Sequence, residues 1–220
     1  MPVRNECEAL EAALEPLRDP RVERIVVDGD SSDGSAARAR ALGAEQVIEC
    51  RPGRSLQLAA GLEAAQGPAV LFLHVDTRLE SGWPTAILDA LRDPSVAGGA
   101  FRLRFESRRA VYRMLEWGVA LRSRVARLPY GDQALFARRE VLERVGIPPT
   151  PIFEDLDLVV QIRRAGRLVL LRQTAQTSPR RYERNGVLPT VVRNNLALAA
   201  WLVGLDRERV ARWYRGTPRR

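Results

Sequence analysis

The first half of the chain alternates short β-branched runs with amphipathic stretches, and this alternation restricts the fold more than any other feature. The runs predict strands at residues 22–28, 46–49 and 69–75, and the stretches predict helices at residues 7–17, 35–42 and 55–65. Such alternation is typical of βαβ units on a mostly parallel sheet flanked by helices, where ligands bind beyond the carboxyl ends of the strands. We therefore expect an α/β fold in which Asp28 and Asp76 end neighbouring strands and face one cleft.

The second half predicts a mixture of elements. We expect a strand region at residues 97–105, a basic helix at 108–128, a short strand at 134–138, and helices at 155–165 and 187–205. A length of 220 residues fits one ordinary domain, and no repeat, low-complexity segment or linker divides it. We expect a single domain over residues 1–220 with a helical C-terminal segment.

The chain contains no lysine, so all 35 of its basic residues are arginines. This composition excludes Schiff-base enzymes and P-loop nucleotide hydrolases, because both need a lysine. Two cysteines and one histidine cannot supply a structural zinc site. The longest apolar run, residues 196–205, is about half as long as a membrane span, and no signal peptide opens the chain. We expect a cytoplasmic protein. The alternative is a protein in peripheral contact with the inner face of the membrane.

The net charge of +8 favours an anionic partner, which can be nucleic acid, a nucleotide diphosphate or an acidic membrane surface. A solvated, arginine-rich surface without such a partner is the alternative. In the helix predicted at residues 108–128, Tyr112, Leu115, Trp117 and Val119 interleave with arginines. This pattern is typical of helices at a membrane interface and also of surface helices packed on a sheet. Both interpretations stay open.

A polar turn follows the predicted strand that ends at Asp28. Residues 26–35 contain three aspartates, three serines and two glycines. The Asp28 carboxylate can accept hydrogen bonds from a nucleobase N–H or a ribose hydroxyl. The turn can also simply begin a helix with Ser32 or Asp33 as the N-cap. No G-x-G-x-x-G pattern follows the strand, which argues against a dinucleotide site.

Two further motifs carry potential ligands and bases. His74 and Asp76 end an apolar strand and are expected to project on the same side, where Asp76 suits a hard divalent cation bound to diphosphate oxygens. Their alternative roles are a core histidine and a turn cap. Glu154, Asp155 and Asp157 precede an apolar helix pattern. They can stabilise the helix start, or their mutual repulsion can produce a general base.

In this order, the motifs resemble those of glycosyltransferase family 2, the inverting enzymes with the GT-A fold. The resemblance spans nearly the whole chain and is closest to a bacterial subgroup described as radical-SAM/selenodomain-associated glycosyltransferases. The residues that carry it are Pro2, Asn5 and Glu6, the turn from Asp28 to Ser35, His74 and Asp76, Gly131, Asp132 and Gln133, Glu154 and Asp155, and Arg180, Arg181 and Tyr182.

The resemblance implies a role for each matched position. Asp155 would be the general base with Glu154 beside it, Asp76 with His74 would hold Mg2+ or Mn2+, and Gly131, Asp132 and Gln133 would contact the acceptor. The residues implied to bind the nucleotide sugar are Pro2, Asn5, Glu6, Asp28, Arg54, Gln57 and Asp76, and those implied to bind its diphosphate are Arg180 and Arg181. A nucleotide-binding half would cover about residues 1–105 and an acceptor half about residues 106–220.

The implied reaction transfers a sugar from a nucleotide-diphosphate sugar to an unidentified acceptor hydroxyl on a lipid or a small molecule. One alternative is a catalytically inactive sugar-nucleotide-binding or membrane-associated scaffold. The other is a basic nucleic-acid-binding protein, suggested by a pI of about 10.7. The chain has no helix-turn-helix, RNA-motif or zinc-finger signature, and a nucleic-acid role leaves the ordered aspartates unexplained, so we expect no nucleic-acid partner.

Overall fold

The strands of the protein form two sheets in a computed structural model that describes residues 1–216, so residues 217–220 of the expected domain lie outside it. The smaller sheet is parallel, has the order β1-β2-β3, and contains β1 (Pro2–Val3), β2 (Ile25–Asp28) and β3 (Gln46–Glu49). The larger sheet has the order β4-β7-β6-β8-β5 and contains β4 (Ala69–Leu71), β5 (Thr77–Leu79), β6 (Val96–Phe105), β7 (Phe136–Arg138) and β8 (Arg167–Thr177). In the larger sheet β6 and β8 pair in parallel, and the other neighbours are antiparallel.

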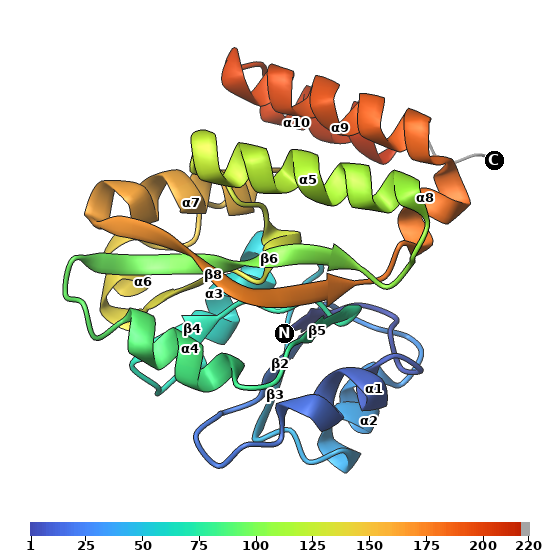
Figure 1. The fold of residues 1–220 in the computed structure, drawn as a ribbon. Coiled ribbons are helices and arrows are strands. Elements are labelled where there is room, and N and C mark those ends of the chain that lie inside the picture. The colour runs from blue at the N-terminus through green and yellow to red at the C-terminus, as the bar shows by residue number, and fades with distance from the viewer. Residues whose placement is uncertain (217–220) are drawn as a thin grey trace.

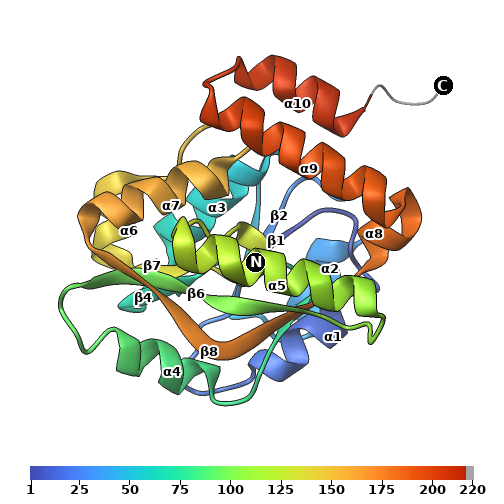
Figure 2. The ribbon, with the colours of Figure 1, turned by 45° about the horizontal axis from the view of Figure 1, so that its top comes forward.

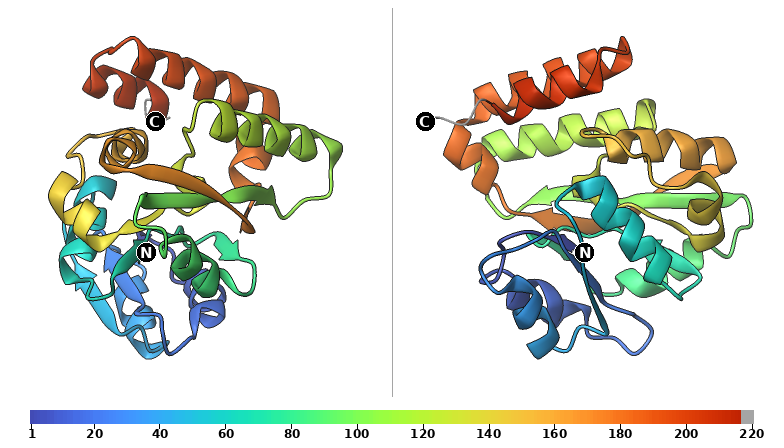
Figure 3. Two further views of the ribbon diagram at one scale, coloured as in Figure 1. Left: turned by 60° about the vertical axis from the view of Figure 1, so that its left-hand side comes forward. Right: turned by 180° about the vertical axis from the view of Figure 1, so that it is seen from behind.

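The helices lie around the two sheets (Figure 1). Those of the first half are α1 (Leu10–Leu14), α2 (Ser35–Ala41) and α3 (Arg54–Ala64). Those of the second half are α4 (Trp83–Ala90), α5 (Ala110–Val125), α6 (Arg139–Val145), α7 (Glu154–Ala165), α8 (Arg180–Asn185), α9 (Val187–Leu202) and α10 (Arg207–Arg215). Short 3-10 turns, η1 (Glu15–Leu17) and η2 (Gly131–Gln133), follow α1 and precede β7. Figures 1 and 3 show α1 and α2 beside the smaller sheet at one end, and α5, α9 and α10 at the opposite end, beyond the larger sheet.

One apolar core joins the two sheets. Val3 and Val26 of the smaller sheet belong to the same buried cluster as Phe101 and Phe136 of the larger one. The two phenylalanine rings meet edge to face with centroids 6.1 Å apart. Strand β6 approaches its neighbours so closely at Gly99 that an added Cβ would lie 2.4 Å from the main-chain oxygen of Val169. The strands that carry the polar turns are therefore fixed against a common interior.

The α/β order expected from the sequence is confirmed, and β3 has the predicted bounds. The strand expected at residues 69–75 is wrong beyond Leu71. Residues 74–77 instead form a turn in which the Thr77 N–H donates to the His74 carbonyl at 3.1 Å. Strand β8 is not among the expected elements, because its apolar run and the polar residues that follow do not alternate along the strand.

The main-chain amino group of Met1 lies inside the fold. It donates a hydrogen bond to the Ile25 carbonyl at 2.8 Å, and burial followed by the charge of Arg54 lowers its pKa to about 5. An apolar pocket beside Met1, with Leu71 and Trp83 among its walls, lies between the sheets. None of the carboxylates expected in the site lines this pocket, so the candidate chemistry lies elsewhere.

Candidate active site

The turn after β2 is tied to the turn after β1 by hydrogen bonds between main chain and side chains. The Asn5 N–H donates to Ser31 Oγ at 2.8 Å, and the Ser32 N–H donates to Asn5 Oδ1 at 2.9 Å. The Cys7 N–H donates to Asp33 Oδ2 at 2.9 Å. Asn5 has a φ of 54°, a left-handed conformation that asparagine tolerates better than most residues. These bonds place Asn5 and the polar turn side by side.

Asp28 is buried at the end of β2, and both of its carboxylate oxygens have partners within the turn. Oδ2 accepts the Ser31 N–H at 3.0 Å, and Oδ1 accepts the Ser31 hydroxyl. Asp33 accepts the Ser35 N–H at 3.0 Å and the Ser35 hydroxyl at 2.6 Å. These bonds, with the hydroxyl bond from Ser35 the largest cause, hold the pKa of Asp33 below its usual value. The N-cap of α2 is Gly34 rather than Ser32 or Asp33, which corrects that alternative, although Asp33 does accept the N–H of Ser35 at the start of the helix.

Gln57 is buried and holds two strand ends together. Its side-chain amide donates to the carbonyls of Val3 and Val27 at 2.8 and 2.9 Å. It lies against Gly29, where an added Cβ would be 2.9 Å from Gln57 Nε2. Both amide protons are therefore used inside the protein, and Gln57 supports the turn that carries Asp28.

Arg54, at the start of α3, is the centre of the site. Its Nε lies 2.7 Å from Glu154 Oε1, and its two terminal nitrogens face the two ring nitrogens of His74, one of them at 3.3 Å. A guanidinium can only donate, so the imidazole nitrogen that it bonds must be an acceptor. Burial and then the charge of Arg54 hold the pKa of His74 well below its usual value. His74 is therefore neutral and partnered by Arg54.

Asp155 lies in the first turn of α7 and receives two main-chain hydrogen bonds. The Gly131 N–H donates to Oδ2 at 2.7 Å, and the Leu156 N–H donates to Oδ1 at 2.9 Å. An added Cβ at Gly131 would lie 3.0 Å from Asp155 Oδ2 and 3.1 Å from an Arg54 terminal nitrogen. The 3-10 turn η2 can approach both side chains because residue 131 is glycine.

Two more carboxyl groups lie near Asp155 with raised pKa values. Burial raises the pKa of Asp132 to about 6, with Asp155 adding to the rise while Arg122 and Arg54 oppose it. Burial also raises the pKa of Glu154, where Arg54 opposes the rise and Asp155 adds to it. Oδ1 of Asp132 has no hydrogen-bond partner and no exposed surface. Three carboxyl groups therefore share the region of one arginine, and one of their oxygens is unpaired.

Gln133 and Asp157 serve the fold. The Gln133 amide is fully buried, donates to the Phe101 carbonyl at 3.0 Å and accepts the Ser123 hydroxyl at 2.9 Å. Asp157 accepts the Trp201 indole N–H at 2.7 Å and lies 3.1 Å from Arg207. Asp157 thereby binds α7 to the C-terminal helices, although it is only two residues from Asp155.

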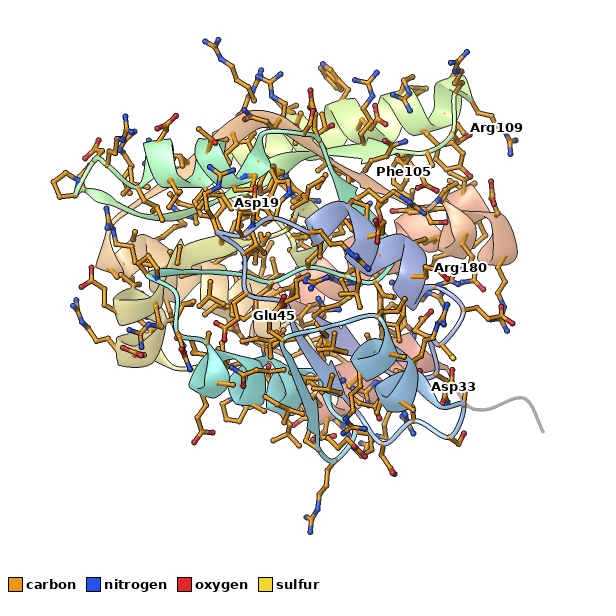
Figure 4. All side chains as sticks on the ribbon, turned by 90° about the horizontal axis from the view of Figure 1, so that it is seen from below. Asp19, Asp33, Glu45, Phe105, Arg109 and Arg180 are labelled. Atoms are coloured by element: carbon orange, nitrogen blue, oxygen red, sulfur yellow. The ribbon has the colours of Figure 1, made fainter. Side chains whose placement is uncertain are left out.

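Of the two expected diphosphate residues, Arg180 lies beside the N-terminal turn and Arg181 contacts a C-terminal helix. Arg180 is 3.6 Å from Glu6, and Arg181 donates to the hydroxyl of Tyr214 on α10 at 2.5 Å. Figure 4 shows Arg180 and Asp33 at the same edge of the molecule. Burial raises the pKa of Glu6, with Arg180 opposing the rise and the charges of Asp76 and Asp33 adding to it. Glu6 therefore lies in reach of both the positive charge of Arg180 and the negative charges of Asp33 and Asp76.

Asp28 and Asp76 do not end neighbouring strands, which corrects the expectation from the sequence. Asp28 ends β2 in the smaller sheet, whereas Asp76 lies in the turn between β4 and β5 of the larger one. His74 and Asp76 are likewise outside any strand, so strand pleating does not orient them. Among residues 1–216, no three His, Cys, Asp or Glu side chains form a group that could hold a metal ion.

The sequence did not indicate three aromatic and basic side chains around the carboxylates. Arg122 of α5 lies over the Tyr130 ring, with 3.4 Å between its guanidinium carbon and the ring centroid. Arg215 of α10 donates to the Pro151 carbonyl next to the start of α7. These contacts join segments far apart in the chain, and no local pattern marks them.

Comparison with known proteins gives consistent matches. The family model "Glycosyl transferase family 2" matches residues 1–146. An uncharacterized glycosyltransferase of Mycobacterium tuberculosis is 30% identical over 174 residues, which cover 76% of this chain and 78% of the relative.

Solved structures with the same fold are more distant in sequence. A mannosyltransferase from Pyrobaculum calidifontis, in complex with GDP-Man and Mn2+, has a TM-score of 0.61 and 22% identity over 80% of this chain and 54% of its own. Glucosyl-3-phosphoglycerate synthase from Mycobacterium tuberculosis, in complex with Mn2+ and UDP-glucose, has a TM-score of 0.55 and 22% identity over 80% of this chain and 67% of its own. The chain thus spans about half of the first structure and two thirds of the second. These likenesses confirm the expected GT-A-like fold.

Proposed function

The chain belongs to glycosyl transferase family 2 and is a glycosyltransferase by that membership, and we propose that it moves a sugar from a nucleotide-diphosphate sugar to an acceptor hydroxyl with inversion at the anomeric carbon. The observation that supports this most is that three other segments of the chain meet at Arg54. The segments contribute His74, Gly131, and Glu154 with Asp155, and they lie between 20 and 101 positions after Arg54 in the chain.

The donor would lie along the turns after β1 and β2. Asn5, Glu6 and Asp28 are proposed to contact the nucleoside, with Pro2 shaping the first turn, and Arg180 and Arg181 to contact the diphosphate. The pairing of Arg180 with Glu6 supports this placement, because it puts a cation beside the nucleoside turn. Arginine binds phosphate with two parallel N–H donors, so it suits this role in a chain without lysine.

Mg2+ or Mn2+ is the ion that this site would take, and Asp76 is the residue that would hold it. A single carboxylate suits an ion that keeps several waters and binds mainly to substrate phosphates. When bound, the ion would stabilise the charge that grows on the leaving phosphate. His74 is proposed as a second ligand, and it would have to exchange its contact with Arg54 for the metal.

Asp155 is proposed as the general base. An acceptor hydroxyl gives its proton to the Asp155 carboxylate while its oxygen bonds to the anomeric carbon. The bond from that carbon to the phosphate oxygen breaks on the opposite face, and the nucleoside diphosphate leaves with the electron pair. The N–H groups of Gly131 and Leu156 orient the two oxygens of Asp155 and leave lone pairs for the proton. Asp132, next to Gly131, is proposed to contact the acceptor.

Several finer assignments remain part of this proposal. They are the donor and acceptor halves at about residues 1–105 and 106–220, membership of the radical-SAM/selenodomain-associated subgroup, a cytoplasmic location, and peripheral membrane contact. No helix among residues 1–216 is long and apolar enough to cross a membrane. A catalytically inactive sugar-nucleotide-binding scaffold is the second candidate, favoured by the engagement of His74 with Arg54.

A panel of sugar nucleotides, each tested with and without Mn2+, checks the donor and metal assignments. We expect one donor to bind in calorimetry and to be hydrolysed slowly, and Asp76→Asn to weaken the Mn2+-dependent binding at least about tenfold. The matched control is Asp89→Asn, an exposed carboxylate on α4. Equal, metal-independent affinity in wild type and Asp76→Asn would remove Asp76 from the site. Binding of a donor with no turnover against any acceptor or water would favour the inactive scaffold.

A further inference from the structure

Exposed apolar side chains are concentrated on one part of the surface. Eleven of the thirteen large hydrophobic residues exposed in the described chain lie on α5 or between residues 188 and 213. We call these eleven the helical face. They are Met114, Trp117, Leu121, Val125, Leu188, Val192, Leu196, Leu202, Val203, Leu205 and Trp213. Figure 2 shows that α5, α9 and α10, which carry most of them, lie on the same side of the molecule.

On α5 the exposed side is apolar as well as the side that packs on the sheet. Tyr112 is fully buried, and Leu115 and Val119 pack with it against Leu103 and Phe105 of β6. The four exposed residues of α5 follow at spacings of three or four, which aligns them along one stripe. Met114 is 73%, Trp117 71% and Val125 76% exposed. Packing on the sheet therefore explains one side of α5 and leaves the other unexplained.

Helix α9 repeats this arrangement. Thr190 and Ala197 are its buried residues, whereas Leu188, Val192 and Leu196 form an exposed stripe at spacings of four, which Val203 continues just after the helix end. Leu188 is 73% and Val203 72% exposed. Two helices with apolar solvent-facing stripes on one side of a protein indicate an interaction surface.

The charge around the helical face identifies the kind of partner. Residues 108–127 and 180–215 contain fourteen arginines and four acidic residues, although the whole chain has a net charge of only +8. Arginines flank the stripe of α5 at both ends. Arg108 and Arg109 precede the helix, Arg124 lies in its last turn and Arg127 follows it, and their long side chains can reach lipid headgroups. A second copy of the chain would bring these positive charges together in a symmetric contact, which disfavours a dimer.

We propose that the helical face docks on an anionic lipid bilayer, with the apolar stripes in the headgroup region and the arginines on lipid phosphates. An apolar stripe with tryptophan on one side and arginines around it is the composition of interfacial helices. The surface borders the acceptor side of the site, because the loop after α5 leads to Asp132, and Arg215 of α10 contacts Pro151 near Asp155. Docking depends on this surface and not on the reaction proposed above.

Vesicle flotation with the full chain tests the proposal. Vesicles of phosphatidylcholine with about one third phosphatidylglycerol should bind the protein, and pure phosphatidylcholine should bind it at least about tenfold less. Two double variants address the apolar stripes, Met114→Ser with Trp117→Ser on α5 and Leu188→Ser with Leu196→Ser on α9. Each should weaken binding at least about tenfold, since each removes two apolar side chains from the headgroup region. The matched control is Leu88→Ser, an exposed leucine on α4, which should bind like wild type.

A loss of binding in either double variant but not in the control supports docking. Wild-type binding in both, or equal binding to neutral and anionic vesicles, would contradict it. Absence of binding to any vesicle, with dimers in sedimentation that the double variants dissolve, would assign the helical face to a second copy. Donor binding by calorimetry should be unchanged in both double variants, which separates a failure of docking from a failure of the proposed reaction.

Discussion

The polar turn after β2 and the cluster around Arg54 both collect carboxylates, yet the two regions treat them in opposite ways. In the turn, Asp28 and Asp33 accept hydrogen bonds from serines and main-chain N–H groups, and the pKa of Asp33 is lowered. In the cluster, the pKa values of Asp132 and Glu154 are raised, and Asp132 Oδ1 has no partner. The carboxylates of the turn are hydrogen-bonded within the protein. Those of the cluster are unfavourable to ionise, because they are buried close together, and a bound substrate can relieve this cost.

Removing the charge of Asp155 should have the largest effect on the reaction and tests the role of the cluster most directly. Asp155→Asn should slow transfer about 100- to 10,000-fold while donor affinity stays close to wild type, because a general base acts mainly in the transition state. Transfer to an acceptor, or slow hydrolysis of the donor, measures the effect.

Asp157→Asn is the matched control, since that carboxylate contacts Trp201 and Arg207 and should affect stability more than rate. Near wild-type transfer in folded Asp155→Asn would move the role of base to Glu154 or Asp132.

Replacing Asp132 tests whether the cluster does hold unfavourable charge. Its folded pKa of about 6 lies above the ordinary value of 3.8, so ionisation destabilises the fold as pH rises from about 4 to about 6. Asp132→Asn should therefore raise the free energy of unfolding at pH 7 by at most about 3 kcal/mol, and by nothing below pH 4. Denaturant unfolding across this pH range measures it. If the two proteins show the same pH dependence, Asp132 is solvated like an ordinary surface carboxylate.

The amino group of Met1, beside the smaller sheet, is a third buried group whose ionisation should affect stability. Its folded pKa of about 5 lies below the ordinary value of 8.0, so protonation opposes folding and stability should rise with pH. Between pH 7 and pH 9 the gain should be about 1.4 kcal/mol. The N-terminally acetylated chain cannot titrate there and should lack this part of the slope. Parallel pH curves for the two chains would place the amino group in water.

A smaller effect is expected in the polar turn after β2, where Ser31 bonds both Asp28 and Asn5. Ser31→Ala removes a hydroxyl that bonds Asp28 and accepts the Asn5 N–H, and it should lower the free energy of unfolding by about 1 kcal/mol. Ser32→Ala is the control and should change little, because Ser32 is exposed. Unchanged stability in Ser31→Ala would mean that the turn is held by its main chain alone, and an equal cost for Ser32→Ala would mean that the effect is not specific to the Ser31 hydroxyl.

Local patterns predicted the elements that carry the motifs, and they failed where partners are distant. The alternation near β2 and β3 and the acidic start of α7 were visible in the sequence, because periodicity and capping are local properties. The turn at residues 74–77 was not, since β5 exists only through its pairing with β8, where Thr77 lies opposite Thr177. The division into two sheets depends on such long-range pairs.

The roles of individual side chains also depend on contacts that local patterns do not show. Asp155 and Asp157 look alike in the sequence, and only the contacts with Gly131 on one side and Trp201 on the other distinguish them. Gln57 matched a position that binds the nucleotide sugar, yet its side-chain amide donates both of its hydrogen bonds to the carbonyls of Val3 and Val27. Arg54 matched a donor-binding position in the sequence, whereas the structure makes it the centre of the cluster, because three segments converge on it only in the folded chain.

The pairing order of the larger sheet also has a consequence for synthesis on the ribosome. The smaller sheet joins residues at most about 25 positions apart, so its strands can pair as soon as β3 has emerged. The turn that carries Asp76 lies next to β5, an edge strand that pairs with β8 about 100 residues later. A nascent chain must therefore reach residue 177 before this turn is fixed, and until then the apolar strands β4, β6 and β7 have an open edge. Slow translation before β8 should lengthen the interval in which the chain can aggregate.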